Sequence, residues 1–286
     1  MKMLTKMACA AALAMSVAGG ANAATVLNNW VFNPNGSGFS SGQRVNEYLD
    51  VNGNAFIELS PGSGSSFSFT EHAVFNIVQA DSKGALFPLN YPGGNITATF
   101  EGTGTGTFGG AFTFSGGTIR MYQNPTNGQY ASTEGFYGAN LGNQIAEFSV
   151  MAGGGGLVDA SGSPLTNGQV SVFASAAAGG LSAGYFFREN GTDLSTESIM
   201  AFAFTNANTV DNPDDTQIDE IVCEFADFNG VGCNGDDYEN VAQQHLFISN
   251  NGQFKLNEVP EPGSLALFGI AMLGAGFAAR KRAAKV

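Results

Sequence analysis

The sequence is poor in the residues on which many catalytic and nucleic-acid-binding sites depend. Its 286 residues include two histidines, three cysteines and one tryptophan, and 11 basic residues stand against 24 acidic ones. A formal net charge of −13 repels nucleic acid and anionic lipid surfaces. These shortages argue against a nucleic-acid partner and leave few groups for acid–base or metal chemistry.

Catalytic signatures are also missing from the sequence. His72 and His245 stand in no Ser-His-Asp or metal-binding pattern, and no Gly-x-Ser-x-Gly elbow is present. The glycine-rich passages 102–107 and 153–156 lack nucleotide-loop spacing, so we expect flexible strand edges or turns there, or a linker between two lobes at 153–156. A glycosidase carboxylate pair, distant in sequence, stays an alternative, but we expect no enzyme.

The amino-terminal end has the layout of a secretion signal. Lys2 and Lys6 precede an apolar, alanine-rich stretch, and Ala21 and Ala23 supply the small residues that signal peptidase requires. We expect cleavage before Ala24, so that residues 1–23 form a signal peptide.

The carboxy-terminal end has the layout of a membrane anchor behind a rigid motif. Pro260, Glu261 and Pro262 precede an uncharged run, 263–279, which spans about 25 Å as a helix. The basic box 280–286, with Arg280, Lys281 and Arg282 at its start, resists translocation. A short transmembrane helix is therefore predicted over 263–279.

These three features together resemble the sorting tail of PEP-CTERM proteins, over about a tenth of the chain. The resemblance implies processing by an exosortase, a membrane-embedded cysteine enzyme, within a segment 259–286 whose motif covers 259–262. By the same resemblance Pro260, Glu261 and Pro262 are recognition residues, and Arg280, Lys281 and Arg282 stop transfer. An ordinary single-pass anchor is the alternative.

The exported region 24–258 is predicted to be all-β. Apolar residues alternate with polar ones, as at Phe67 and Phe69 or Phe112 and Phe114, and clusters such as Pro61-Gly62-Ser63-Gly64 mark turns. This pattern predicts one Gly- and Phe-rich domain with an antiparallel β-sandwich or related fold, whose core is built from phenylalanine, of which the whole chain has 24. An exposed aromatic row that stacks on sugars stays an alternative, because alternation does not identify the wet face.

Removal of both ends leaves Cys223 and Cys233, and we expect them to form a disulfide in an oxidising compartment. A zinc site is the weaker alternative, because two cysteines without a nearby histidine make a poor ligand set.

An acidic segment surrounds these cysteines. Region 24–258 holds five basic and 23 acidic residues, a net charge of −18, and ten of the acids lie between Asp211 and Glu239. Asp227, Asn229, Asp236 and Asp237 are candidate calcium ligands, because calcium prefers six to eight oxygen ligands. A solvated acidic loop without calcium is the preferred interpretation.

The body of the chain resembles the flocculation-associated PEP-CTERM proteins, in the stretch 67–75 and in the acidic segment with its two cysteines. This resemblance implies a surface or matrix protein that acts with exopolysaccharide in floc or biofilm formation. A secreted carbohydrate-binding module or adhesin is the first alternative, and a secreted glycan hydrolase is the second.

Overall fold

The computed structural model describes residues 25–89, 91, 95–124, 130–165 and 168–259. Its elements are β1 (Trp30–Phe32), η1 (Phe39–Ser41), β2 (Gln43–Val45), β3 (Tyr48–Pro61), β4 (Ser66–Ser82), β5 (Ala85–Pro88), β6 (Asn95–Thr107), β7 (Ala111–Asn124), β8 (Asn143–Val150), β9 (Gly153–Leu157), β10 (Gly168–Ala176), β11 (Phe186–Phe187), η2 (Leu194–Thr196), β12 (Ile199–Thr209), α2 (Asp215–Gln217), η3 (Ile218–Phe225) and β13 (His245–Glu258). Residues Val26–Asn257 form one compact unit. The described chain is thus mostly antiparallel β-structure, and the all-β prediction is confirmed.

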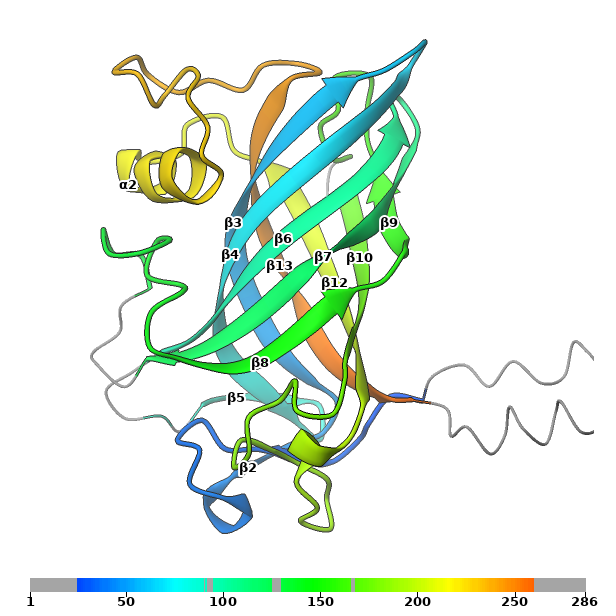
Figure 1. The fold of residues 1–286 in the computed structure, drawn as a ribbon, viewed down its shortest axis with the longest axis vertical. Helices are drawn as coiled ribbons and strands as arrows, with labels where there is room; N and C mark the ends of the chain where they lie inside the picture. Colours follow the sequence, from blue (N-terminus) through cyan, green and yellow to red (C-terminus); the bar gives the residue numbers. More distant parts are fainter. Residues whose placement is uncertain (1–24, 90, 92–94, 125–129, 166–167, 260–286) are drawn as a thin grey trace, which may run out of the picture. The chain divides into compact units, whose positions relative to one another are not determined.

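The main sheet closes on itself. Its strands follow the order β12-β13-β3-β4-β6-β7-β8-β10, and β10 pairs with β12 from Gly168↔Ala207 to Ala176↔Ile199 (Figure 1). The predicted sandwich of two sheets is therefore wrong in this detail. Alternation of apolar and polar residues is the same in both architectures, because each has one dry face and one wet face.

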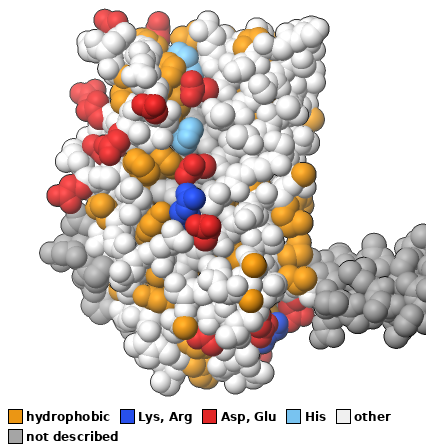
Figure 2. Space-filling model, viewed as in Figure 1, with side chains coloured by type: hydrophobic (Ala, Val, Ile, Leu, Met, Phe, Trp, Pro, Cys, Tyr) orange, Lys and Arg blue, Asp and Glu red, His pale blue; other side chains and the backbone are white. Residues whose placement is uncertain are grey.

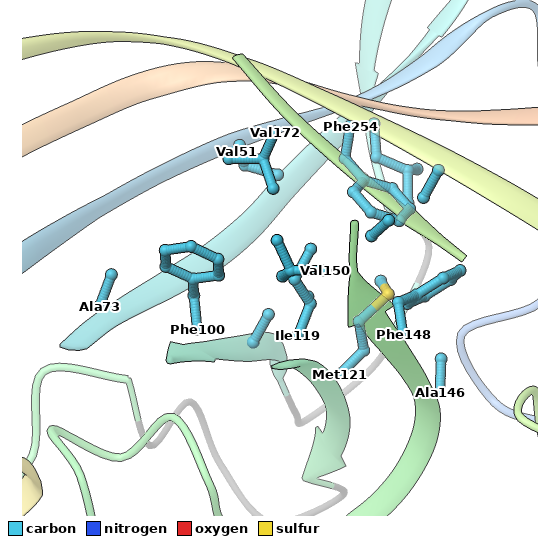
Figure 3. Close-up of a cluster of buried hydrophobic side chains, with 14 of the residues drawn as sticks. Val51, Ala73, Phe100, Ile119, Met121, Ala146, Phe148, Val150, Val172 and Phe254 are labelled. Carbon is cyan, nitrogen blue, oxygen red and sulfur yellow. The ribbon is translucent and has the colours of Figure 1, made fainter. Parts of the chain in front are cut away.

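The interior of the closed sheet is filled by side chains from all around the ring. Figure 3 shows Phe100 of β6, Ile119 and Met121 of β7, Phe148 of β8 and Phe254 of β13 pointing toward one another. A smaller sheet with the order β11-β1-β2 packs Trp30, Phe32 and Phe186 into the same core. The prediction that phenylalanine builds the core is thus confirmed for most of the phenylalanine rings in the described chain, but not for all of them.

The glycine passage 102–107 lies in β6, a strand with a partner on each side. Gly102, Gly104 and Gly106 face inward, and the rings of Phe100, Phe69 and Phe67 respectively occupy the space where their Cβ atoms would lie. The expectation of a flexible strand edge is wrong, whereas a bulge is present in the β6–β7 pairing between Thr103 and Gly104. Glycine is needed here because an aromatic ring lies directly over the backbone.

The second glycine passage, 153–156, is also not a linker. Gly153–Leu157 forms β9, which pairs with both β7 and β10. Gly153, Gly154 and Gly155 have positive φ angles, so this irregular strand requires residues without a Cβ atom.

A Gly104→Ala substitution is expected to lower the unfolding free energy by about 1 to 3 kcal/mol, because the new methyl group overlaps the Thr113 carbonyl and the Phe69 ring. Gly116→Ala is the matched control, since its Cβ meets nothing within 4 Å. Denaturant unfolding of both variants measures the difference. Equal stability of the two variants would contradict this account of the glycines.

Candidate functional site

Four adjacent strands, β12, β13, β3 and β4, present amide side chains on their outer face. Asn52 of β3 pairs with Asn251 of β13 on one side and with Asn76 of β4 on the other. One step along the strands, Asn54 pairs with Ser249. Because side chains alternate along a strand, these residues point outward while Val51, Gly53 and Ala55 are buried.

A groove runs between this face and the loop 130–141. It encloses about 290 Å³. It is lined by Asn52, Gly53, Asn54, Tyr130, Tyr137, Asn206, Asn208, Ser249, Asn250 and Asn251. We call this set of residues the amide groove.

The tyrosine side of the amide groove is held in place by hydrogen bonds. The Tyr130 backbone N–H donates to Asn95 Oδ1 at 3.0 Å, and Thr97 Oγ1 donates to the Ala139 carbonyl at 2.7 Å. The Tyr130 and Tyr137 rings meet edge to face with centroids 5.3 Å apart. The loop is therefore fixed on the sheet through its own side chains and backbone.

The amide groove is neutral but has an acidic neighbour. Burial raises the pKa of Tyr130 above its ordinary value, and burial together with the nearby Asp214 charge raises the pKa of Tyr137. Both phenols therefore keep their protons at neutral pH, and the Tyr130 hydroxyl donates to the Val74 carbonyl at 3.5 Å. The described residues that line the groove carry no charge, so uncharged hydrogen-bonding groups are its natural ligands.

The acidic segment packs against the outer face beside the amide groove, because Tyr137 lines the groove and also packs with η3. Ile221, Val222 and Phe225 of η3 bury themselves with Phe56 and Phe247 of the sheet in a second core. The capping side chain of Asp214 accepts from the Gln217 N–H at 3.0 Å, which helps to start the helical stretch. Figure 2 shows acidic side chains gathered on the side where α2 and η3 lie, while most of the strand surface in this view is uncharged.

Cys223 and Cys233 form the predicted disulfide. It ties the end of η3 to the loop that follows. The loop that follows η3 has no helix or strand of its own, and the disulfide holds it close to η3 and thus to the sheet.

The four candidate calcium ligands, Asp227, Asn229, Asp236 and Asp237, lie in the loop that this disulfide closes and in the residues just after it. Asn229 Nδ2 donates to the Asp227 backbone carbonyl at 3.2 Å, and the Asp236 N–H donates to Asn234 Oδ1 at 3.4 Å. Asp237 is exposed. In the described part of the chain, no three His, Cys, Asp or Glu residues gather as metal ligands.

Both histidines lie against aromatic rings. His72 meets Phe225 with centroids 5.0 Å apart, and His245 lies between Phe228, at 5.0 Å, and Tyr238, at 5.7 Å. The Nδ1 atom of each ring is buried and without a hydrogen-bond partner among the described residues. Burial lowers the pKa of both, so each is a neutral packing residue at neutral pH.

Glu71 of β4 is a carboxyl group that lies among apolar residues in the interior of the closed sheet. The side chain is 7% exposed and makes no hydrogen bond or ion pair to a described residue. It lines two adjoining apolar cavities of about 60 and 30 Å³, which also share Val170. Since a water molecule occupies about 30 Å³ of liquid, these cavities suit a few waters and exclude a sugar ring.

The sequence contains a spacing of asparagines that predicts part of the amide groove and that the overall composition does not reveal. Asn52-Gly53-Asn54 and Asn206-Ala207-Asn208 place amides at period two, so each pair faces the same side of a strand. Tyr130 and Tyr137 carry no such signal, because their approach to the sheet depends on the path of a loop. The predicted residues of signal cleavage and of the sorting tail lie outside the described residues. They are Ala21, Ala23, Ala24, Pro260, Glu261, Pro262, Arg280, Lys281 and Arg282.

No helix among the described residues is long and apolar enough to cross a membrane, and the predicted span 263–279 falls outside them. The comparison with curated proteins found no match, and neither did the comparison with solved structures.

Substitution of Glu71 by glutamine is expected to remove a pH-dependent loss of stability. Burial raises the pKa of Glu71 from 4.5 to about 8. The folded chain then keeps a proton that the unfolded chain releases, so stability falls as pH rises from about 4.5 to about 8, by on the order of 5 kcal/mol. Urea unfolding across this range measures the effect.

The control for this experiment is Glu134→Gln, at an exposed position. It should keep the wild-type pH dependence, whereas the stability of Glu71→Gln should vary much less across the same window. Parallel curves for wild type and Glu71→Gln would refute the assignment of this carboxyl group.

One comparison identifies a segment of the chain. Residues 258–282 match the family model of the PEP-CTERM protein-sorting motif. This match confirms the resemblance found in the tail and indicates export with a carboxy-terminal sorting signal that an exosortase processes. The chain therefore consists of a closed, antiparallel β-domain followed in the sequence by a PEP-CTERM sorting motif.

Proposed function

We propose that this protein is a surface or matrix protein whose β-domain binds exopolysaccharide at the amide groove and so helps to hold cells in flocs or biofilm. The observation that carries the proposal is the gathering of uncharged amides and two tyrosines in one groove. Amide groups both donate and accept hydrogen bonds, and sugar hydroxyls do the same. Tyrosine adds an apolar ring face with a polar tip.

Binding without turnover fits this groove better than hydrolysis does. Glycoside hydrolysis uses two carboxyl groups about 5 to 10 Å apart, flanking the scissile bond. None of the described residues that line the amide groove is Asp or Glu. The proposal is therefore a binding protein and not an enzyme.

Charge supports a polysaccharide partner over nucleic acid. The 23 acidic and five basic residues of region 24–258 repel a phosphate backbone. Neutral hydroxyl-rich polymers carry no such penalty, and the same surface charge keeps the exported domain soluble in a dense matrix.

The groove is tested by replacing both asparagines of its cross-strand pair. Asn52→Ala/Asn251→Ala is expected to weaken retention on exopolysaccharide purified from the same cells by about 10- to 30-fold, because two hydrogen-bonding side chains worth about 1 kcal/mol each are lost. Affinity electrophoresis measures the change. The control Asn143→Ala removes an exposed amide from β8 and should bind as wild type does.

Equal retention of the double variant and wild type would reject the amide groove as the binding site. Absence of retention for wild type itself would reject polysaccharide binding. Thermal unfolding of each variant shows whether the fold has been preserved.

The sorting step is tested by intact-mass measurement of the protein from cells and from matrix, with and without the exosortase gene. The expected product begins at Ala24 and ends near Pro260 to Pro262, and it appears only in the strain with the enzyme. A chain that extends through Val286 in both strains would contradict exosortase processing.

A further inference from the structure

Three phenylalanines of the neighbouring strands β10 and β12 lie outside both cores of the domain. Phe173 of β10 and Phe202 and Phe204 of β12 belong to neither buried cluster, and Phe173 is 37% exposed. Their strand neighbours Val172 and Ala203 line the interior cavity, so the three rings point to the opposite, outer face. Phe202 and Phe204 are half-buried, and packing in the two cores does not explain the outward position of any of the three rings.

The rings form a platform on two paired strands. Phe173 stands directly across from Phe202 in the β10–β12 pairing, with ring centroids 5.3 Å apart. Ser171 stands across from Phe204, and its hydroxyl donates to the Gly155 carbonyl at 3.3 Å. We call Phe173, Phe202 and Phe204 the phenylalanine platform.

The phenylalanine platform continues into the amide groove along one strand. The outward positions of β12 read Phe202, Phe204, Asn206 and Asn208 in order, and the last two line the groove. At about 3.3 Å per residue, Phe202 and Asn208 lie about 20 Å apart. The outer face of β12 therefore presents aromatic rings at one end and hydrogen-bonding amides at the other.

We infer that the polysaccharide extends along β12, with one segment hydrogen-bonded in the amide groove and the next stacked on the phenylalanine platform. This inference rests on the proposed function. Sugar rings match such a track, because their C–H faces suit aromatic rings and their hydroxyl groups suit amides. Continuity with a polar groove favours a sugar polymer as the occupant over a second copy of this chain.

The consequence is a dependence on chain length. Short oligosaccharides fill the amide groove alone, and longer ones gain affinity by reaching the phenylalanine platform. Phe202→Ala and Phe173→Ala are therefore expected to bind long oligosaccharides about tenfold more weakly than wild type, while short ones bind unchanged. Phe202→Tyr, which keeps the ring, should restore most of the affinity.

The experiment uses calorimetry with size-fractionated oligosaccharides, prepared by partial hydrolysis of the purified exopolysaccharide. Leu86→Ala is the control, because Leu86 is an exposed apolar residue on β5, which pairs with β4. It should leave binding unchanged at every length. Sedimentation equilibrium on each variant reports the oligomeric state.

The outcomes separate this inference from the proposed function. If wild type binds oligosaccharides of every length with the same affinity, or if Phe202→Ala binds each length as tightly as wild type does, the phenylalanine platform is not part of the binding site. Either result is compatible with binding at the amide groove. A wild-type dimer that Phe173→Ala converts to a monomer, with binding unchanged, would assign the platform to self-association instead. No binding of any oligosaccharide to wild type would overturn both proposals.

Discussion

The pairing of β10 with β12 is the interaction on which the rest of the structure depends. It joins the two ends of the strand order and leaves the ring without a free edge, so every ring strand has a partner on both sides. Closure also separates the two faces completely. The inner face becomes one apolar core, and the outer face becomes available for polar and aromatic residues that do not serve folding.

The interior shows how tightly this closure constrains the sequence. The inward-facing glycines of β6 lie under phenylalanine rings, so the small residues leave room for the large ones and together they fill the core. Glu71 departs from the pattern, since an unpartnered carboxyl group in an apolar interior is stable only while protonated. The two interior cavities beside Glu71 are too small for a sugar ring, which directs the search for a binding site to the outer face.

On that outer face, different segments add different properties to a common sheet. The acidic segment 211–239 buries its apolar side and exposes carboxylates, whereas the amide groove next to loop 130–141 is neutral. The phenylalanine platform adds outward-facing apolar rings, two of which lie on the same strand as two groove asparagines. The surface thus contains a polar and aromatic track beside a strongly acidic region, an arrangement suited to an uncharged polymer in water.

The sequence by itself determined the sorting tail, the β-rich fold and the pairing of Cys223 with Cys233, because each depends on local order, alternation or the count of a scarce residue. Only the tertiary structure decided that the sheet closes, because alternation is the same in a closed sheet and a sandwich. The tertiary structure also brought Asn52, Asn206 and Asn251 together, and it separated the exposed ring of Phe173 from the buried ring of Phe148. Strand register and the path of a loop set those neighbours, and neither is written in any short stretch of the chain.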